Sequence, residues 1–145
     1  MKISTVFEHN GQIPSKYTCD GEDVAPILNI SDVPQNAEEL VLIVDDPDCP
    51  IGTWVHWVLY NIPKDTKVID NDNLSSEIKE GMTDFKRLGW GGPCPPNGVH
   101  RYYFKLYAIN KKLSLKEGAT KQQVMAEIKD NIVEQVELIG LYKRI

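Results

Sequence analysis

Polar side chains that can bind an anion or transfer a proton gather in two parts of the sequence. Asp46 and Asp48 follow an apolar run, and His56 comes a few residues later. In the second part, His100 and Tyr102 come directly after a loop rich in glycine and proline. Imidazole and phenol groups can donate hydrogen bonds to an anion, and together with a carboxylate they can act as acid and base. Both chemistries require the fold to bring these five residues into one cavity.

Three segments have the β-branched, leucine-rich or aromatic composition that is typical of strands, namely residues 40–44, 54–62 and 101–109. The first of these, LVLIV, is apolar without alternation, which predicts a strand buried on both faces. Sequential elements are usually neighbours in space. We therefore expect the three strands to lie side by side.

A helix is predicted late in the chain. Thr120 and Gln123 have the spacing of a capping box, and Val124, Ile128 and Ile132 recur at helical spacing. Residues 136–145 return to a strand-like pattern. Long β segments with one late helix predict a mainly β fold over residues 1–145. We expect a single-domain sheet sandwich with the helix at one edge or end, followed by a final strand.

Two stiff loops precede the candidate residues of the second and third strands. Seven of the ten residues in 89–98 are glycine or proline, so this segment is expected to be a shaped loop. Pro47 and Pro50 fix the backbone around Asp48, and the Cys49-Pro50 bond is a candidate cis peptide. Such loops would hold polar side chains in fixed positions.

Alternation along the strands predicts which side chains share a face. His56 is expected on one face with Trp54 and Val58, and His100 on one face with Tyr102. Tyr102 should in turn share its face with the side chains of Phe104 and Leu106, while Arg101 and Lys105 point to the other side of the sheet.

Each candidate also has a structural interpretation. Asp46 and Asp48 stand beside prolines, where aspartates commonly bond local backbone amides in turns. His56 lies between two tryptophans and suits a core position, and Tyr102 stands in an aromatic run. His9 has no partner pattern, so we assign it no role.

Composition narrows the functional classes. The net charge of −5 arises from 21 acidic and 16 basic residues without a basic cluster, which argues against nucleic-acid binding. No apolar run is long enough for a signal peptide or a membrane span, so a cytoplasmic protein without membrane insertion is expected. Cys19, Cys49 and Cys94 have no CxxC spacing and are expected to be free thiols, with one bridge between two loop cysteines as the alternative.

The motifs together resemble a known family. They are DPDCP at residues 46–50, HW at 56–57, NIP at 61–63, GPCPP at 92–96 and GVHRYYFKLY at 98–107. Further matches are YTCDG at 17–21 and the closing helix and strand, with GAT at 118–120 and GLY at 140–142. In this order they closely resemble the phosphatidylethanolamine-binding protein family, in its short bacterial and archaeal Raf-kinase-inhibitor-like branch.

The resemblance implies an antiparallel β-sheet sandwich with a small cavity that accepts phosphate-like anions. It also implies modulation of lipids, kinases or proteases, and a homodimer. No cofactor is expected. Cys49 stands where the family usually has alanine, and we interpret it as filling that site. Carried over by motif, the cavity residues are Asp46, Asp48, His56, Gly92, Pro93, His100 and Tyr102.

These residues suggest a binding model for a small anion or a phosphorylated ligand. Asp48 would be occupied by loop backbone donors, while Asp46 would bond an imidazole. Protonated His56 and His100, the Tyr102 hydroxyl and backbone amides near residues 91–92 would meet the anion, so binding would weaken as the pH rises.

Three alternatives remain at this stage. The same Asp, His and Tyr residues would serve a phosphoester hydrolase, although no activated nucleophile is evident. A metal site is a weaker interpretation, because no short-spacing pair of ligands occurs. An inhibitor of a kinase or protease would act through an exposed loop, with Trp90 either as its anchor or packed over the sheet edge.

Overall fold

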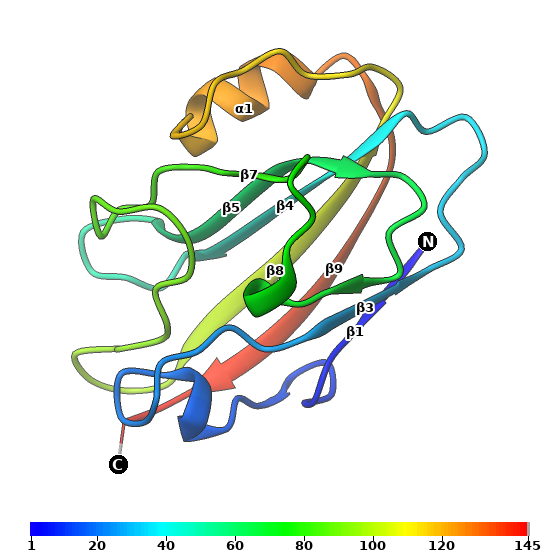
Figure 1. Ribbon diagram of the computed structural model, residues 1–145. Helices are drawn as coiled ribbons and strands as arrows, with labels where there is room; N and C mark the ends of the chain where they lie inside the picture. Colours follow the sequence, from blue (N-terminus) through cyan, green and yellow to red (C-terminus); the bar gives the residue numbers. More distant parts are fainter. Residues whose placement is uncertain (145) are drawn as a thin grey trace.

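The computed structural model describes residues 1–144 as two sheets and a helix in three layers (Figure 1). The smaller sheet has the order β1-β3-β6, formed by Lys2–Ser4, Leu28–Ser31 and Val68–Ile69. The larger has the order β2-β9-β8-β4-β5-β7, formed by Gly11–Gln12, Ile132–Tyr142, His100–Ile109, Glu39–Asp46, Trp54–Pro63 and Lys79–Glu80. The helical elements are η1 (Ser15–Tyr17), η2 (Asn71–Asn73) and α1 (Lys121–Ile128). The predicted mainly β sandwich with a late helix and a final strand is confirmed.

Strand β4 is buried on both faces, as its unbroken apolar run predicts. Leu40, Leu42 and Val44 pack into the core between the two sheets. Val41 and Ile43 belong to a second core on the helix side. Because neither face meets water, β4 takes a central position, and both of its edges are paired.

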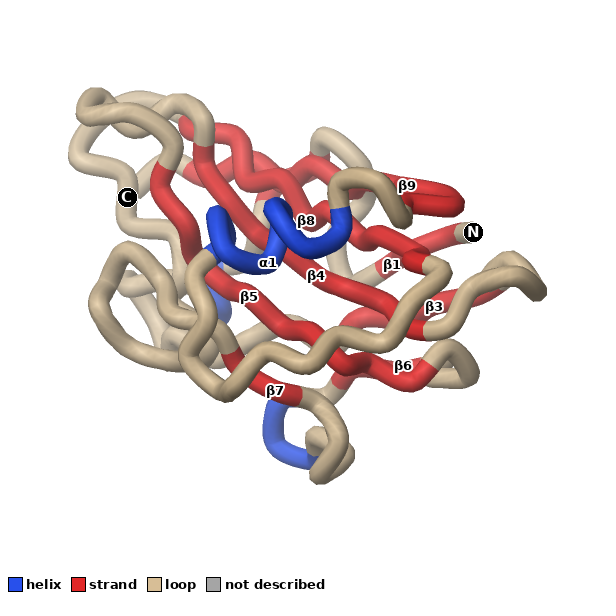
Figure 2. The backbone as a smooth tube through the Cα atoms, turned by 90° about the horizontal axis from the view of Figure 1, so that it is seen from above, coloured by secondary structure: helices blue, strands red, loops and turns tan. Residues whose placement is uncertain are grey.

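Helix α1 begins at the predicted capping box. The Thr120 hydroxyl accepts a bond from the Gln123 amide, and the Gln123 side chain accepts one from the Thr120 amide. Val124 and Ile128 are buried against β4 and β5, so the helix covers a face of the larger sheet rather than an edge (Figure 2). Ile132, which we assigned to the helical pattern, instead begins β9. Within residues 1–144, no helix has the length and hydropathy that a membrane crossing requires.

The three predicted strands are neighbours, with β4 between β5 and β8. Asp46 pairs with Trp54 of β5, and Asp45 pairs with Tyr103 of β8. Both pairings are antiparallel, so the carboxyl end of β4 lies beside the amino ends of its two neighbours. This arrangement brings the two polar motifs together.

Candidate functional site

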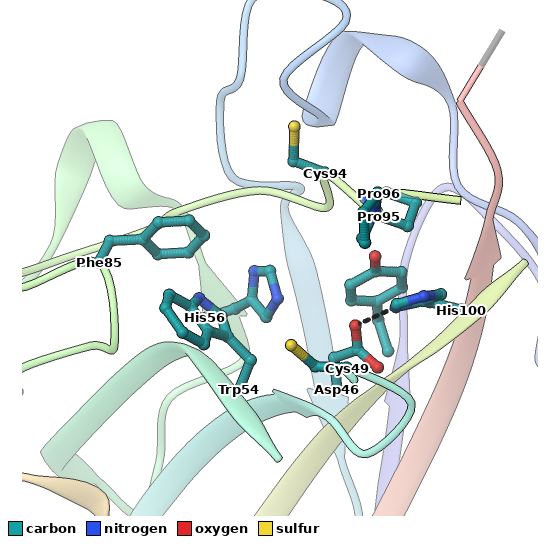
Figure 3. Close-up of a pocket in the computed structure, with 10 residues that line it drawn as sticks. Asp46, Cys49, Trp54, His56, Phe85, Cys94, Pro95, Pro96 and His100 are labelled. Carbon is teal, nitrogen blue, oxygen red and sulfur yellow. Dashed lines mark hydrogen bonds and ion pairs between the residues drawn. The ribbon is translucent and has the colours of Figure 1, made fainter. Parts of the chain in front are cut away.

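A cavity of about 210 Å³ lies at this end of the larger sheet (Figure 3). Ten residues line it, namely Asp46, Cys49, Trp54, His56, Phe85, Cys94, Pro95, Pro96, His100 and Tyr102. Four of the seven residues carried over by motif are among them: Asp46, His56, His100 and Tyr102. Asp48, Gly92 and Pro93 are not part of the lining.

Asp46 and His100 form a buried pair inside the cavity. The Nδ1 atom of His100 lies 2.6 Å from Oδ2 of Asp46, and both side chains are almost fully buried. The other carboxylate oxygen, Oδ1, accepts the Asp48 amide at 2.7 Å. Asp46 therefore bonds an imidazole, as expected. Each of its carboxylate oxygens accepts a hydrogen bond from the protein, and these bonds partly compensate its negative charge.

A β-bulge interrupts the pairing of β5 with β4 at His56. The register between β4 and β5 shifts by one residue at His56, which has no partner on β4. Bulges bend a strand and change the direction in which a side chain points. His56 and Trp54 line the cavity together, as alternation predicts, whereas Val58, which follows the bulge, packs on the helix side. The expectation that Val58 would share this face is wrong, because alternation does not continue through a bulge.

The His56 ring is held by the backbone of the glycine-rich loop. Its Nδ1 lies 2.6 Å from the Gly91 carbonyl oxygen, and the Gly91 amide donates to the His56 carbonyl at 3.0 Å. Burial lowers the pKa of His56 below its ordinary value, against the opposing effects of the Gly91 bond and of nearby carboxylates such as Asp46. The positively charged His56 that we expected is therefore disfavoured in the folded protein.

Tyr102 contributes a buried hydroxyl that has no hydrogen-bond partner among the residues that the structure describes. Its side chain is 1% exposed, and within residues 1–144 its hydroxyl makes no hydrogen bond. The ring contacts His56 edge-on at 5.2 Å between centroids and stacks on His100 at 6.5 Å. Burial raises the pKa of Tyr102, so the hydroxyl keeps its proton at neutral pH. A buried hydroxyl without a partner in a cavity wall is an unusual feature that a ligand oxygen would satisfy.

Asp48 is bound to Arg101 outside the cavity. Its carboxylate accepts the Arg101 amide at 2.9 Å and the guanidinium at 2.8 and 2.9 Å. These hydrogen bonds lower the pKa of Asp48, and the pair is partly exposed. Asp48 thus joins the loop after β4 to strand β8. The expectation that loop backbone donors would occupy Asp48 is wrong, because the donors to its carboxylate come from the amide and guanidinium of Arg101 in β8.

Gly92 and Pro93 are hydrogen-bonded to the amino-terminal segment and are not part of the cavity lining. The Gly92 amide donates to Oδ1 of Asp23 at 2.9 Å, and the Pro93 carbonyl accepts the Cys19 amide at 3.1 Å. A Cβ atom at Gly92 would lie 2.2 Å from that Asp23 oxygen, so only glycine allows this close approach. With the Gly91 amide bound to His56, both amides that we expected at the anion are already occupied.

A disulfide joins the glycine-rich loop to the amino-terminal segment. Cys19 and Cys94 are bonded, and Cys49 is free. The expectation of three free thiols is therefore wrong, and the alternative of one bridge between loop cysteines is correct. The two cysteines are 75 positions apart, so only the packing of the two loops brings them together. The Cys49-Pro50 bond, a candidate for cis, is trans.

The lining offers no grouped set of metal ligands. Within the described part of the chain, no three His, Cys, Asp or Glu side chains are placed to hold one metal ion. His56 and Asp46 are instead held by the Gly91 carbonyl and by His100. Among the lining residues, the Tyr102 hydroxyl and the Nε2 atoms of His56 and His100 have no hydrogen-bond partner in the described part of the chain, and these groups suit a small polar ligand.

Comparison with known proteins identifies the family. The family model described as phosphatidylethanolamine-binding protein matches residues 3–143. This chain belongs to the phosphatidylethanolamine-binding protein family. The match covers the helix, every residue of the cavity and both sheets except Lys2 of β1.

Relatives and solved structures of this family resemble the chain over almost its full length. A UPF0098 protein of Methanothermobacter thermautotrophicus is 46% identical, with 99% of each chain covered. One from Pyrococcus horikoshii is 42% identical over 99% of this chain and 77% of the relative. A crystal structure of a phosphatidylethanolamine-binding protein homologue from Chlamydia trachomatis has a TM-score of 0.93 at 36% identity, covering 99% and 97% of the two chains. YbcL of Escherichia coli has a TM-score of 0.91 at 25% identity, covering 99% and 98%.

The positions of some residues in the cavity of this family member could not be predicted from the sequence. Phe85 contacts His56 at 5.2 Å between ring centroids, but it lies in an irregular loop whose course depends on tertiary packing. Cys94 lies in a recognised motif, but its place in the cavity wall depends on how the glycine-rich loop packs against the amino-terminal segment that contains Cys19. Trp90 is 7% exposed and packs against Trp57, so it is a core residue and not an exposed anchor.

Proposed function

We propose that this protein binds small anions, and phosphate groups in particular, in the cavity formed by Asp46, His56, His100 and Tyr102, without catalysing their conversion. The main observation is the buried Tyr102 hydroxyl, which has no hydrogen-bond partner within the described residues and lies in the cavity wall. An unsatisfied buried hydroxyl costs about 1–3 kcal/mol, which a ligand oxygen that accepts a hydrogen bond from it would recover.

Two features make an anion acceptable beside a carboxylate. Asp46 is already bound to His100 and to the Asp48 amide, which reduces the repulsion that its charge would cause. The Nε2 atom of His100 is free of protein partners in the described part of the chain, and in the charged ring it would donate to the ligand. Tyr102 therefore provides one donor of the proposed site, and His100 adds a second when its ring is protonated.

Phosphate titration followed by calorimetry tests this function. We expect saturable binding to the wild-type protein, and weakening of about tenfold in Tyr102→Phe, the cost of losing one donor to a charged ligand. Tyr103→Phe is the matched control, because Tyr103 follows in the sequence but is outside the cavity lining. Equal binding by wild type and Tyr102→Phe would contradict the proposal.

The same samples test whether binding is non-catalytic. Incubation with methyl phosphate, followed by ³¹P NMR, is expected to show no release of inorganic phosphate. If the protein still releases inorganic phosphate after further purification and the His56→Ala variant does not, the result would favour a phosphoester hydrolase instead. Modulation of a kinase or protease and formation of a homodimer stay predictions from the family resemblance.

A further inference from the structure

We propose that the cavity prefers phosphate monoesters and hydrogen phosphate over phosphodiesters and sulfate, because His56 presents a hydrogen-bond acceptor, and among these anions only those with a P–O–H group can donate to it. This selectivity rests on the anion-binding function proposed above and names the ligand class of the same cavity.

The backbone of the glycine-rich loop fixes the tautomer of His56. The Gly91 carbonyl oxygen, 2.6 Å from Nδ1, can only accept a hydrogen bond, so Nδ1 must carry the proton. In the neutral ring, Nε2 then has a lone pair and no proton. Within residues 1–144, no hydrogen bond to Nε2 is present, and the ring lines the cavity. Nε2 is therefore an acceptor available to a ligand.

The surroundings of His56 favour this neutral form. Burial lowers the pKa of His56, and this effect exceeds the opposing influence of the Gly91 bond and of three carboxylates. The titratable side chains that act on His56 or share its cavity are Asp23, Asp45, Asp46, Cys49, His100 and Tyr102. Near neutral pH, His56 thus offers an acceptor in a cavity where the Tyr102 hydroxyl offers a donor.

The two sides of the cavity make opposite demands on a ligand. Figure 3 shows the His56 ring on one side and the Asp46–His100 pair on the other. The Tyr102 hydroxyl requires a ligand oxygen that accepts a hydrogen bond, whereas Nε2 of neutral His56 requires one that donates a hydrogen bond. A phosphate monoester with its second pKa near about 6 provides both kinds of oxygen around neutrality.

Sulfate and phosphodiesters have only accepting oxygens at this pH. Bound in the cavity, either ligand would set an oxygen lone pair against the lone pair of His56 Nε2, unless His56 took up a proton against its lowered pKa. A buried acceptor left unpaired weakens binding by about tenfold to a hundredfold. The same difference is expected between methyl phosphate and dimethyl phosphate.

Calorimetric titrations of the full chain with methyl phosphate, dimethyl phosphate and sulfate at about pH 6.5 test the proposal. Dimethyl phosphate matches the charge of the monoester monoanion, and sulfate matches the shape of phosphate, so neither charge nor size alone explains a common deficit. We expect methyl phosphate to bind at least about tenfold more tightly than the other two. If all three bind alike, the anion site stands and the selectivity is refuted. If none binds, the proposed function itself fails.

A substitution assigns the selectivity to His56. In His56→Gln, the side-chain amide can turn a donor or an acceptor toward the ligand, so the preference for methyl phosphate should fall to within about threefold. His9→Gln is the matched control at an exposed histidine outside the cavity, and it should keep the wild-type ratio. A wild-type ratio in His56→Gln would overturn the assignment.

Two further measurements need only the wild-type protein. Long-range ¹⁵N–¹H NMR spectra of the wild-type protein should show His56 protonated at Nδ1 alone, both free and with methyl phosphate bound. A proton on Nε2 at about pH 7 would refute the acceptor. As the pH falls toward about 5 and His56 gains a proton, the preference for methyl phosphate over sulfate should shrink.

The source of the monoester is distinguished in the same assay by a phosphoserine peptide. Similar affinities for the peptide and methyl phosphate would show that the phosphate group alone is enough for binding, as it would be in a small phosphorylated metabolite. A tighter peptide would identify a phosphorylated protein side chain as the source. In both cases the monoester must bind more tightly than dimethyl phosphate. If neither the peptide nor methyl phosphate has a higher affinity than dimethyl phosphate, the monoester selectivity is contradicted.

Discussion

Removal of the Cys19–Cys94 bond should destabilise the protein strongly while leaving its fold intact. The bond closes a loop between residues that are 75 positions apart in the sequence. In the chain-entropy model, opening a loop of this length raises the entropy of the unfolded state by an amount worth about 4.5 kcal/mol at room temperature. Measured values for native disulfides lie around 2–5 kcal/mol, so we expect a loss in the unfolding free energy within that range.

The folded state keeps other connections at the same place. The Cys19 amide donates to the Pro93 carbonyl at 3.1 Å, and the Gly92 amide donates to Asp23 at 2.9 Å. These two bonds hold the glycine-rich loop against the amino-terminal segment without the covalent link. The effect of reduction should therefore fall mainly on the unfolded state.

Urea denaturation of oxidised wild type, reduced wild type and the Cys19→Ser/Cys94→Ser variant measures the loss. With a urea m-value of about 2 kcal/mol/M, a loss of about 3 kcal/mol moves the midpoint by about 1.5 M. The m-value should be fitted separately, because an unlinked chain expands further when it unfolds. Cys49→Ser is the control, since Cys49 is the free cysteine and its removal leaves the bond in place. A loss below about 1 kcal/mol on reduction would refute the loop-closure reasoning.

Three further predictions concern stability. Thr120→Ala should cost about 1 kcal/mol of unfolding free energy, because it removes the side-chain acceptor of the α1 capping box, and a thermal melt in which the variant matched wild type would contradict this. Gly140→Ala should cost about 1–3 kcal/mol by denaturant titration, since the new Cβ would lie 2.6 Å from atoms of Phe7 and Ile13; a neutral result would show that these side chains move aside. The unfolding free energy should fall as the pH drops below about 6.5, because His56 takes up a proton more readily in the unfolded chain than in the folded protein, where its pKa is lowered. His56→Gln should lose this part of the pH dependence, and an unchanged slope of unfolding free energy against pH in that variant would be evidence against the prediction.

Local patterns predicted the main elements well. The unbroken run in β4 predicted a strand buried on both faces, and its two sets of side chains enter two different cores. The capping box predicted where α1 begins, because that signal depends on side chains three residues apart. The end of the helix was less predictable. Ile132 fits the helical spacing but pairs with Ile109 in the larger sheet, where tertiary pairing decides its conformation.

The cavity was predicted in part. His100 and Tyr102 lie on one face as alternation requires, and Asp46 bonds an imidazole as expected. The bulge at His56 could not be predicted by alternation, since it depends on the register with β4. Asp48 forms an ion pair with Arg101 on the other face of β8 and lies outside the cavity. Its position in the DPDCP motif could not predict this, because the pairing depends on how β8 packs beside the loop after β4.

The sequence by itself determined the β-rich fold, the helix start and the chemical types of the residues near the cavity, because these follow from residue type and short spacing. Only the tertiary structure decided how those groups are used. Burial, which depends on the whole chain, lowers the pKa of His56, and the Gly91 carbonyl fixes its tautomer across 35 positions of sequence. Packing of two distant loops likewise joins Cys19 to Cys94. Protonation states and long-range bonds depend on neighbours in space, which the order of residues alone does not specify.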